Sequence, residues 1–396
     1  MLNYYTKVIL LFLVIILASC EDNQIVNNTD LQDTVSNQLQ RADAVHFNVN
    51  DFQSVLDKNG EIALGSYLPP NDERLNVIYS AGLWIAVNDG GSVKANVTWV
   101  GTAEASNFTA DRNDSSIGVY YVPSNITNAD EYHWPVEYGA PINNDGSIKT
   151  YGDLMCWQSL TSDNRVTERV FQNPIDGLRV NQAVYGYSEN DLRNVFFVRY
   201  EITNLSDHVW PEVYVGFHSD TDFGDVLCNS TAYDSASSLT YTYIPVTEDG
   251  CLGGAPVTGF SFLETPNSLG VTTHRIMRKN NYVNPEFGEY ELNTPEQVLF
   301  ALQGLDSNGN PMINPVTGLV TNYAFTGDPI TQTGWLDEAV DVRSLLTSGS
   351  FSLGVNETKV LTVVWISESE STMEESIIKL KDQLNQIRQE PQLWQF

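Results

Sequence analysis

The sequence predicts an all-β fold, a large antiparallel β-sandwich with one amphipathic helix near its C-terminal end. Runs of β-branched and aromatic residues recur between turn-forming segments, which is the pattern of many short strands. The best-defined run is 195–202, and the turn residues Asn204-Leu205-Ser206-Asp207 close it. A second run at 213–217 follows, so the two strands should form a β-hairpin or a corner that leads into the acidic loop at 220–225.

The other strand predictions depend on the same signals. Residues 77–87 are almost continuously apolar and end at the turn Asn88-Asp89-Gly90-Gly91, after which 93–100 alternates, as in a β-hairpin. In 178–187 the alternation changes phase at Gln182, which indicates a β-bulge. A short helix is expected within 293–305. Further strands are expected at 117–122, 151–158, 239–244, 257–263, 321–325, 349–353 and 360–366.

One segment has strong helical character. Thr372-Met373-Glu374-Glu375 is a capping box, in which the threonine and the glutamate three residues later satisfy backbone groups of the first turn. Apolar residues then recur at helical spacing on one face: Ile377, Leu380, Leu384 and Ile387. We therefore predict a helix over 372–389 that packs on the sandwich, with contact to a partner as the alternative.

The N-terminal segment has the features of a lipoprotein signal peptide. Lys7 precedes an apolar run at 8–18, which is too short for a transmembrane helix of about 20 residues. Leu17-Ala18-Ser19-Cys20 resembles a bacterial lipobox, in which the cysteine becomes the lipidated first residue of the mature protein. The predicted division of the chain is a signal peptide at 1–19, a polar tether at 20–45, a sandwich domain at 46–370 that could consist of two sub-sandwiches, and the helix with its tail at 371–396.

The charge balance excludes some partners. The chain has 50 acidic and 20 basic residues, a formal net charge of −30. Such a chain is repelled by nucleic acid and by anionic lipid, so attachment to a membrane has to come from the lipid on Cys20. The acidic balance suits a solvated exterior and divalent-cation sites.

The remaining cysteines are Cys156, Cys228 and Cys251. Cys156 lies in the apolar run Leu154-Met155-Cys156-Trp157 and is expected to be a buried thiol. Cys228 and Cys251 flank one excursion of an exported chain, where a disulfide can form. The sequence leaves open whether these two are bridged.

Several stretches resemble, in order, a family of uncharacterised exported proteins of Bacteroidota and related bacteria. The matching stretches are SAGLWI at 80–85, WPVEYGAP at 134–141, DTDFGD at 220–225, GDPITQTGW at 327–335, DVR at 341–343, GSF at 349–351 and SIIKLK at 376–381. The resemblance implies an exported β-rich domain, often with a type IX secretion tail, and it brings no activity. This chain departs from that pattern, because it ends in a helix followed by Trp394-Gln395-Phe396.

Two further features bear on the resemblance. Glu21-Asp22, directly after Cys20, resembles a surface-export signal of lipoproteins of that phylum, so we expect an outer-membrane lipoprotein that faces outward. Family members often continue the acidic loop with further aspartates, whereas here Leu227-Cys228-Asn229-Ser230 follows.

The acidic loop is the best candidate site. Asp220, Asp222 and Asp225 place three carboxylates around a glycine, and calcium takes six to eight oxygen ligands. The spacing is shorter than an EF-hand, so Asp234 or backbone carbonyls would have to add ligands. A solvated acidic turn is the alternative. The turn at 306–310 is a weaker second candidate for calcium.

The function is a choice between two classes. The leading prediction is a non-catalytic surface module that binds a glycan or a protein, or that has a structural role in the cell envelope. Trp134 and Trp335 lie in loop-like sequence and are candidates for stacking on sugars, with a role in bracing their loops as the alternative. The alternative is a carbohydrate-active hydrolase that pairs Asp220 or Asp222 with Asp225 or Glu264 as acid and base, with His218 near Asp220. No nucleophile elbow or histidine metal motif is present in the sequence.

Overall fold

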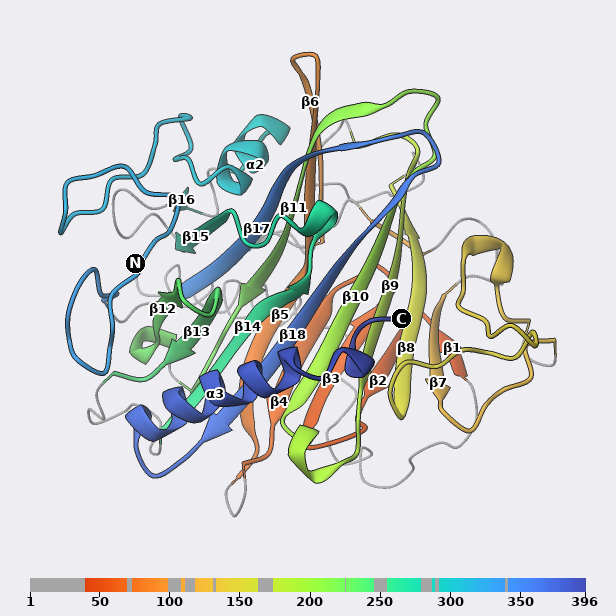
Figure 1. The fold of residues 1–396 in the computed structure, drawn as a ribbon, viewed down its shortest axis with the longest axis horizontal. Coiled ribbons are helices and arrows are strands. Elements are labelled where there is room, and N and C mark those ends of the chain that lie inside the picture. The colour runs from red at the N-terminus through yellow and green to blue at the C-terminus, as the bar shows by residue number, and fades with distance from the viewer. Residues whose placement is uncertain are drawn as a thin grey trace, which may run out of the picture. The chain divides into compact units, whose positions relative to one another are not determined.

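The computed structural model describes residues 40–69, 73–98, 108–110, 118–130, 133–162, 174–224, 226–245, 255–278, 287–288, 292–338 and 341–396. All of these belong to one compact unit, residues 37–396. Within them, the strands form two sheets that are antiparallel apart from one short parallel pair (Figure 1). The predicted fold class, an antiparallel β-sandwich with a C-terminal helix, is confirmed.

Sheet A contains nine strands among the described residues. Their order is β1 (Gln40–Ala42), β7 (Val119–Pro123), β8 (Leu154–Thr161), β9 (Leu178–Gly186), β10 (Val195–Asn204), β18 (Thr358–Ser369), β14 (Pro256–Glu264), β13 (Leu239–Tyr243) and β12 (Ser230–Asp234).

Sheet B also contains nine. Their order is β16 (Phe287–Gly288), β15 (Thr273–Arg278), β17 (Val342–Leu353), β11 (Trp210–Asp220), β5 (Leu75–Asp89), β4 (Ile62–Tyr67), β3 (Phe52–Asp57) and β2 (Ala44–Phe47). The ninth strand, β6 (Ser92–Val97), pairs with β5 through the predicted hairpin turn, where Gly90 and Gly91 have φ values of 60° and 97°.

The main core lies between the two sheets and is rich in aromatic side chains. Trp365 of β18 stacks on Phe196 of β10 and on Phe260 of β14, with ring centroids 5.8 and 5.2 Å apart. Phe217 of β11 reaches Phe260 from sheet B at 5.1 Å, edge to face. Burying rings of this size provides most of the energy that holds the two layers together.

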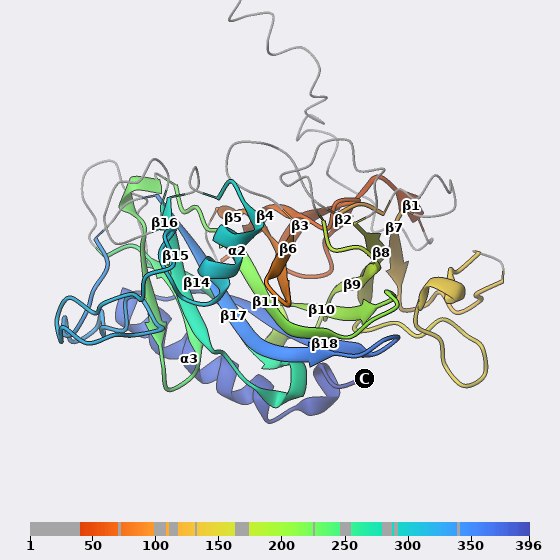
Figure 2. The same cartoon turned by 90° about the horizontal axis from the view of Figure 1, so that it is seen from above.

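Each sheet also carries a helix on its outer face (Figure 2). On sheet A lies α3 (Met373–Arg388), whose predicted face is buried: Ile377, Leu380, Leu384 and Ile387. Its cap forms as expected, with the Thr372 side chain accepting a hydrogen bond from the Glu375 backbone N–H at 3.2 Å. On sheet B lies α2 (Pro295–Leu302), inside the range where a short helix was expected. Gly216 of β11 allows its approach, because a Cβ there would lie 2.7 Å from Leu302.

The two central strands of the sequence analysis form a corner. β10 pairs with β9 and β18 in sheet A, whereas β11 pairs with β17 and β5 in sheet B. The Asn204 side chain holds the turn between them, accepting a hydrogen bond from Ser206 N at 2.9 Å and donating to His208 O at 2.8 Å. The connection from β17 to β18 also changes sheets, and it bonds to this corner through Asn356 N and Asn204 O at 2.7 Å.

Two local predictions are wrong. β9 pairs without a register shift, so no bulge occurs at Gln182. The phase change there reflects burial on both faces of the strand, because Gln182 lies in the interior, where its side-chain N donates to Gly60 O at 3.0 Å. Residues 321–325 form no strand and make only an isolated bridge between Tyr323 and His274.

Among the described residues, no helix has the length and apolar character required to cross a membrane.

Candidate metal site

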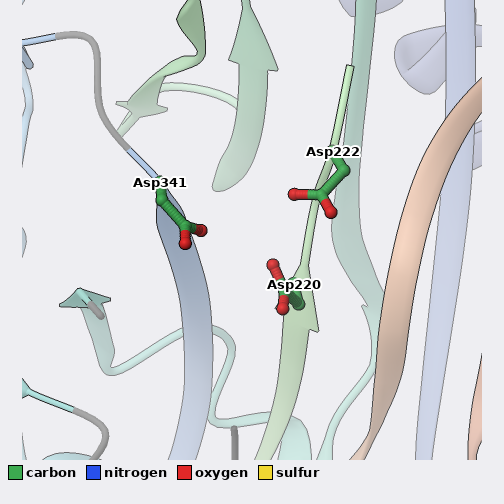
Figure 3. Close-up of side chains that lie close together, drawn as sticks. All are labelled: Asp220, Asp222 and Asp341. Atoms are coloured by element: carbon green, nitrogen blue, oxygen red, sulfur yellow. The ribbon is translucent and has the colours of Figure 1, made fainter. Parts of the chain in front are cut away.

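Three aspartates from two distant segments meet on the outer face of sheet B. Asp220 is the last residue of β11, Asp222 follows it in the loop, and Asp341 directly precedes β17. Their carboxylate oxygens lie within 4.8 Å of one another, and the side chains point toward a common space (Figure 3). Asp220 and Asp341 are buried and Asp222 is half-buried. We call these three residues the aspartate cluster.

Strand alternation and register place Asp220 in this position. Val215 and Phe217 point into the core between the sheets, so Asp220 shares the opposite face with the residues that contact α2. The antiparallel register then sets Arg343 of β17 and Ser80 of β5 on either side of Asp220. A buried polar row therefore crosses three strands.

The loop after β11 is held by Asn229. The side-chain oxygen of Asn229 accepts a hydrogen bond from Phe223 N at 2.8 Å, and its side-chain nitrogen donates to Phe223 O at 3.0 Å. Phe223 is itself fully buried in the main core. Because this residue anchors the loop directly after Asp222, the chain turns back at that point and Asp222 stays next to Asp220.

Arg343 is the cation of this group. One guanidinium nitrogen lies 3.0 Å from Asp220 Oδ2 and the other lies 2.6 Å from Asp341 Oδ1. The nearby His218 adds no positive charge, because burial and the charge of Arg343 lower its pKa to about 3; its ring stacks on Trp84 at 4.8 Å. The three carboxylates and Arg343 together have a formal net charge of −2, and two of the three carboxylates are buried.

The structure brings together two of the three predicted metal ligands. Asp220 and Asp222 lie side by side, whereas Asp225 is outside the described residues. Sequence reasoning missed Asp341 as a ligand, although Asp341-Val342-Arg343 is one of the stretches that carry the family resemblance. Its position before a strand was visible in the sequence, but its proximity to Asp220 depends on β17 pairing with β11.

The other candidate ligands are engaged elsewhere. Asp234 bonds to Lys381 at 3.2 Å and to Ser237 at 2.8 Å, at the end of β12 in sheet A. Asp306 accepts hydrogen bonds from the backbone N–H groups of Asn308 and Asn310 at 2.9 and 2.8 Å. These are the contacts of a hairpin turn, and they account for the 306–310 sequence without a metal.

The carboxylate pair of the hydrolase alternative is not formed with Glu264. Glu264 bonds to Arg199 at 2.9 Å on the outer face of sheet A, where α3 lies. Asp220 and Asp222 lie on the outer face of sheet B, on the other side of the sandwich. The remaining proposed partner, Asp225, is outside the described residues.

Both candidate sugar-stacking tryptophans are buried, so the prediction that they present exposed ring faces is wrong. Trp134 is 4% exposed, packs on Trp157 at 5.2 Å and donates its ring N–H to Pro141 O at 3.0 Å. Trp335 is 7% exposed and packs on Phe325 at 5.1 Å. Each ring supports its own loop, because a large apolar surface under a loop is more stable covered than solvated.

The structure confirms the prediction for Cys156 and part of the prediction for Cys228. Cys156 is a buried free thiol, and burial raises its pKa well above the usual range. Cys228 is in a disulfide. Cys251 and Cys20 lie outside the described residues, so the Cys228–Cys251 pairing and the lipidation of Cys20 stay predictions.

Comparison with known proteins adds no assignment. No protein-family model matches the chain, and no curated protein matches it. Among solved structures, the chain is similar to the Slr1438 protein of Synechocystis sp. PCC 6803 (8% identity, TM-score 0.31, covering 85% of this chain and 100% of that one). It is also similar to an aldose 1-epimerase candidate of Escherichia coli K12 (8%, 0.32, 84% and 100%) and a mutarotase candidate of Salmonella typhimurium (9%, 0.30, 85% and 96%). TM-scores this low carry no argument about function.

Proposed function

We propose that this protein is a calcium-stabilised lipoprotein of the outer-membrane surface, and that its sandwich is a non-catalytic module that binds a glycan or a protein. The observation that carries the calcium part is the aspartate cluster, in which three carboxylates lie within 4.8 Å of one another beside a single arginine. The lipid anchor at Cys20 and the outward orientation depend on the sequence, as argued above.

The donor atoms of the cluster favour a hard cation. Within the described residues the group contains carboxylates alone, without histidine or cysteine, and calcium and magnesium prefer oxygen ligands. Ser80 gives independent support. It is fully buried, it is the cross-strand neighbour of Asp220, and its hydroxyl has no hydrogen-bond partner among the described residues. A bound ion would use that oxygen and would offset the net charge of −2.

A non-catalytic role is favoured because the buried carboxylates are engaged in structural contacts. Asp220 and Asp341 both bond to Arg343, which holds the two carboxylates in one geometry. Hydrolysis of a glycosidic bond needs two carboxylates on either side of an accessible cleft. In the cluster, by contrast, the carboxylates of Asp220 and Asp341 are buried.

Thermal unfolding of the full chain tests the calcium site. The melting temperature should rise in millimolar calcium relative to chelator, because an ion that binds only the folded state adds about 2.7 kcal/mol at a hundredfold excess over Kd. Asp222→Asn should remove most of that rise. The matched control is Asp130→Asn, an exposed aspartate away from the cluster, which should keep it. Equal melting curves in calcium and chelator would return the cluster to a plain arginine–carboxylate network.

Membrane fractionation tests the anchor. Cys20→Ala should release the protein from the membrane fraction, because the acidic surface has no affinity of its own for anionic lipid. A variant that stays with the membrane would overturn the lipoprotein assignment.

A further inference from the structure

A groove of about 700 Å³ runs beside α3, where segments of both sheets meet the helix. Its volume is within the range of roughly 300–1,000 Å³ that is typical of ligand sites. We call it the α3 groove. Five segments line it: Asp51 before β3, residues 67–69 at the end of β4, residues 191–194 before β10, Glu368 near the end of β18, and one face of α3.

The floor of the α3 groove is a preformed network of amides and one buried carboxylate. The side chains of Asn194 and Gln383 form a reciprocal amide pair, with N···O distances of 2.7 and 2.8 Å. Asn194 also donates to Glu368 Oε1 at 2.7 Å, and Gln383 donates to Asp191 O at 2.9 Å. The Glu368 side chain is only 3% exposed. The polar groups at the floor are therefore positioned before any ligand arrives, which reduces the entropic cost of binding.

The charges of the α3 groove disfavour an anionic ligand. Four carboxylates line it, from Asp51, Asp191, Glu368 and Asp382, against the two cations Arg193 and Lys379. Both cations are already engaged, Arg193 with Asp51 at 2.6 Å and Lys379 with Glu368 at 3.1 Å. A phosphate or a uronate would meet a net charge of −2 and no cation free of a carboxylate partner.

The walls of the α3 groove combine polar and apolar surface. Asp382 and Gln386 project from the exposed side of α3, whereas Leu68 and Pro69 give the opposite segment an apolar strip. A sugar ring matches this combination, because its hydroxyl groups both donate and accept hydrogen bonds and its C–H face is apolar.

We propose that the α3 groove binds an oligosaccharide that is neutral or carries amino groups, with Asp382 and Gln386 hydrogen-bonding to its hydroxyl groups. This inference names the ligand and the site of the binding module proposed above, and it rests on that proposal.

Calorimetric titration of the full chain with three matched oligosaccharide sets, neutral, aminated and uronate-containing, tests the inference. The neutral or aminated set should bind, and the uronate set should bind at least about tenfold more weakly. Gln386→Ala and Asp382→Ala should each weaken binding by about three- to tenfold, as expected for one lost hydrogen bond. The matched control is Asn385→Ala, the neighbouring exposed residue outside the groove, which should bind as the wild type does.

The outcomes separate this inference from the proposed function. Sugar binding that is unaffected by both groove substitutions would overturn the groove as its site and leave the binding role in place. Equal affinity for uronates would overturn the electrostatic argument. Binding of a lysine-rich peptide at Gln386 and Asp382 without any saccharide binding would overturn the ligand class.

Discussion

The two outer faces of the sandwich each bury an arginine between two carboxylates, and they differ in how far water reaches the acids. On sheet A, Arg199 is 7% exposed, while its partners Glu201 and Glu264 are 30% and 36% exposed. On sheet B, Arg343 is 5% exposed, and its partners Asp220 and Asp341 are 2% and 9% exposed. The longer glutamate side chains reach solvent, whereas the aspartates do not.

This difference in solvent exposure favours a metal site on sheet B over one on sheet A. Partly solvated glutamates can carry excess negative charge at little cost, because water and salt screen it. The aspartate cluster has two buried carboxylates beside Arg343 and a third, that of Asp222, which is half-buried. Carboxylates that lie this close together in a buried position favour a bound cation.

The largest expected effect comes from removing the two arginines. Arg343→Met should lower the unfolding free energy by about 3–5 kcal/mol, because it leaves buried carboxylates without their cation. Arg199→Met should cost about 1–2 kcal/mol, because its glutamates recover water. Urea unfolding in chelator measures both.

Added calcium should affect the stability of the two arginine variants differently. It should restore part of the stability of the Arg343→Met chain, since the ion can replace the lost charge, and it should not restore that of Arg199→Met. Equal losses for the two variants would contradict the role assigned to burial.

Replacing His274, an ionisable side chain enclosed between the sheets, should have an intermediate effect on the free energy of unfolding. Its ring nitrogens lie 2.9 Å from Ala324 O and 3.0 Å from Thr240 Oγ1, and burial lowers its pKa to about 4. Between pH 6.5 and about 4 the unfolded chain therefore binds a proton that the folded chain does not. Stability from this group is present above pH 6.5 and is lost as the pH falls through that window.

The test is urea unfolding at pH 7 and pH 4.5. His274→Gln should reduce the loss of stability between these two pH values by on the order of 2 kcal/mol. The exposed His46 is the control, and His46→Gln should leave the loss nearly unchanged. An unchanged pH dependence in His274→Gln would show that the folded chain protonates this histidine as readily as the unfolded chain does.

The smallest effect is expected at the solvated pair on sheet A. Glu264→Gln removes a charge but keeps a side chain that can still accept a hydrogen bond from Arg199, and Glu201 remains nearby. The unfolding free energy should fall by about 0–1 kcal/mol at moderate salt, as for other exposed ion pairs. A loss above about 2 kcal/mol in urea unfolding would mean that this pair is as desolvated in solution as the pair on sheet B.

Sequence reasoning succeeded where the signal is local. The strands β10 and β11 follow from their side chains, and α3 follows from its cap at Thr372 and its apolar spacing. It failed where burial comes from distant segments. Gln182 breaks the alternation of β9 because both faces of sheet A are covered. Asp341 joins a site 120 residues earlier in the chain through pairing that no local pattern encodes.

The last two strands of the chain occupy central positions, β17 between β11 and β15 in sheet B, and β18 between β10 and β14 in sheet A. A chain that emerges from its N-terminus onward cannot complete either sheet until these late residues arrive. Most of its ladders therefore depend on contacts far apart in sequence, which slows folding. Until synthesis reaches these residues, β11 and β15 lack the strand that lies between them, β17, and β10 and β14 lack β18, so edges that are paired in the folded protein stay open to other chains.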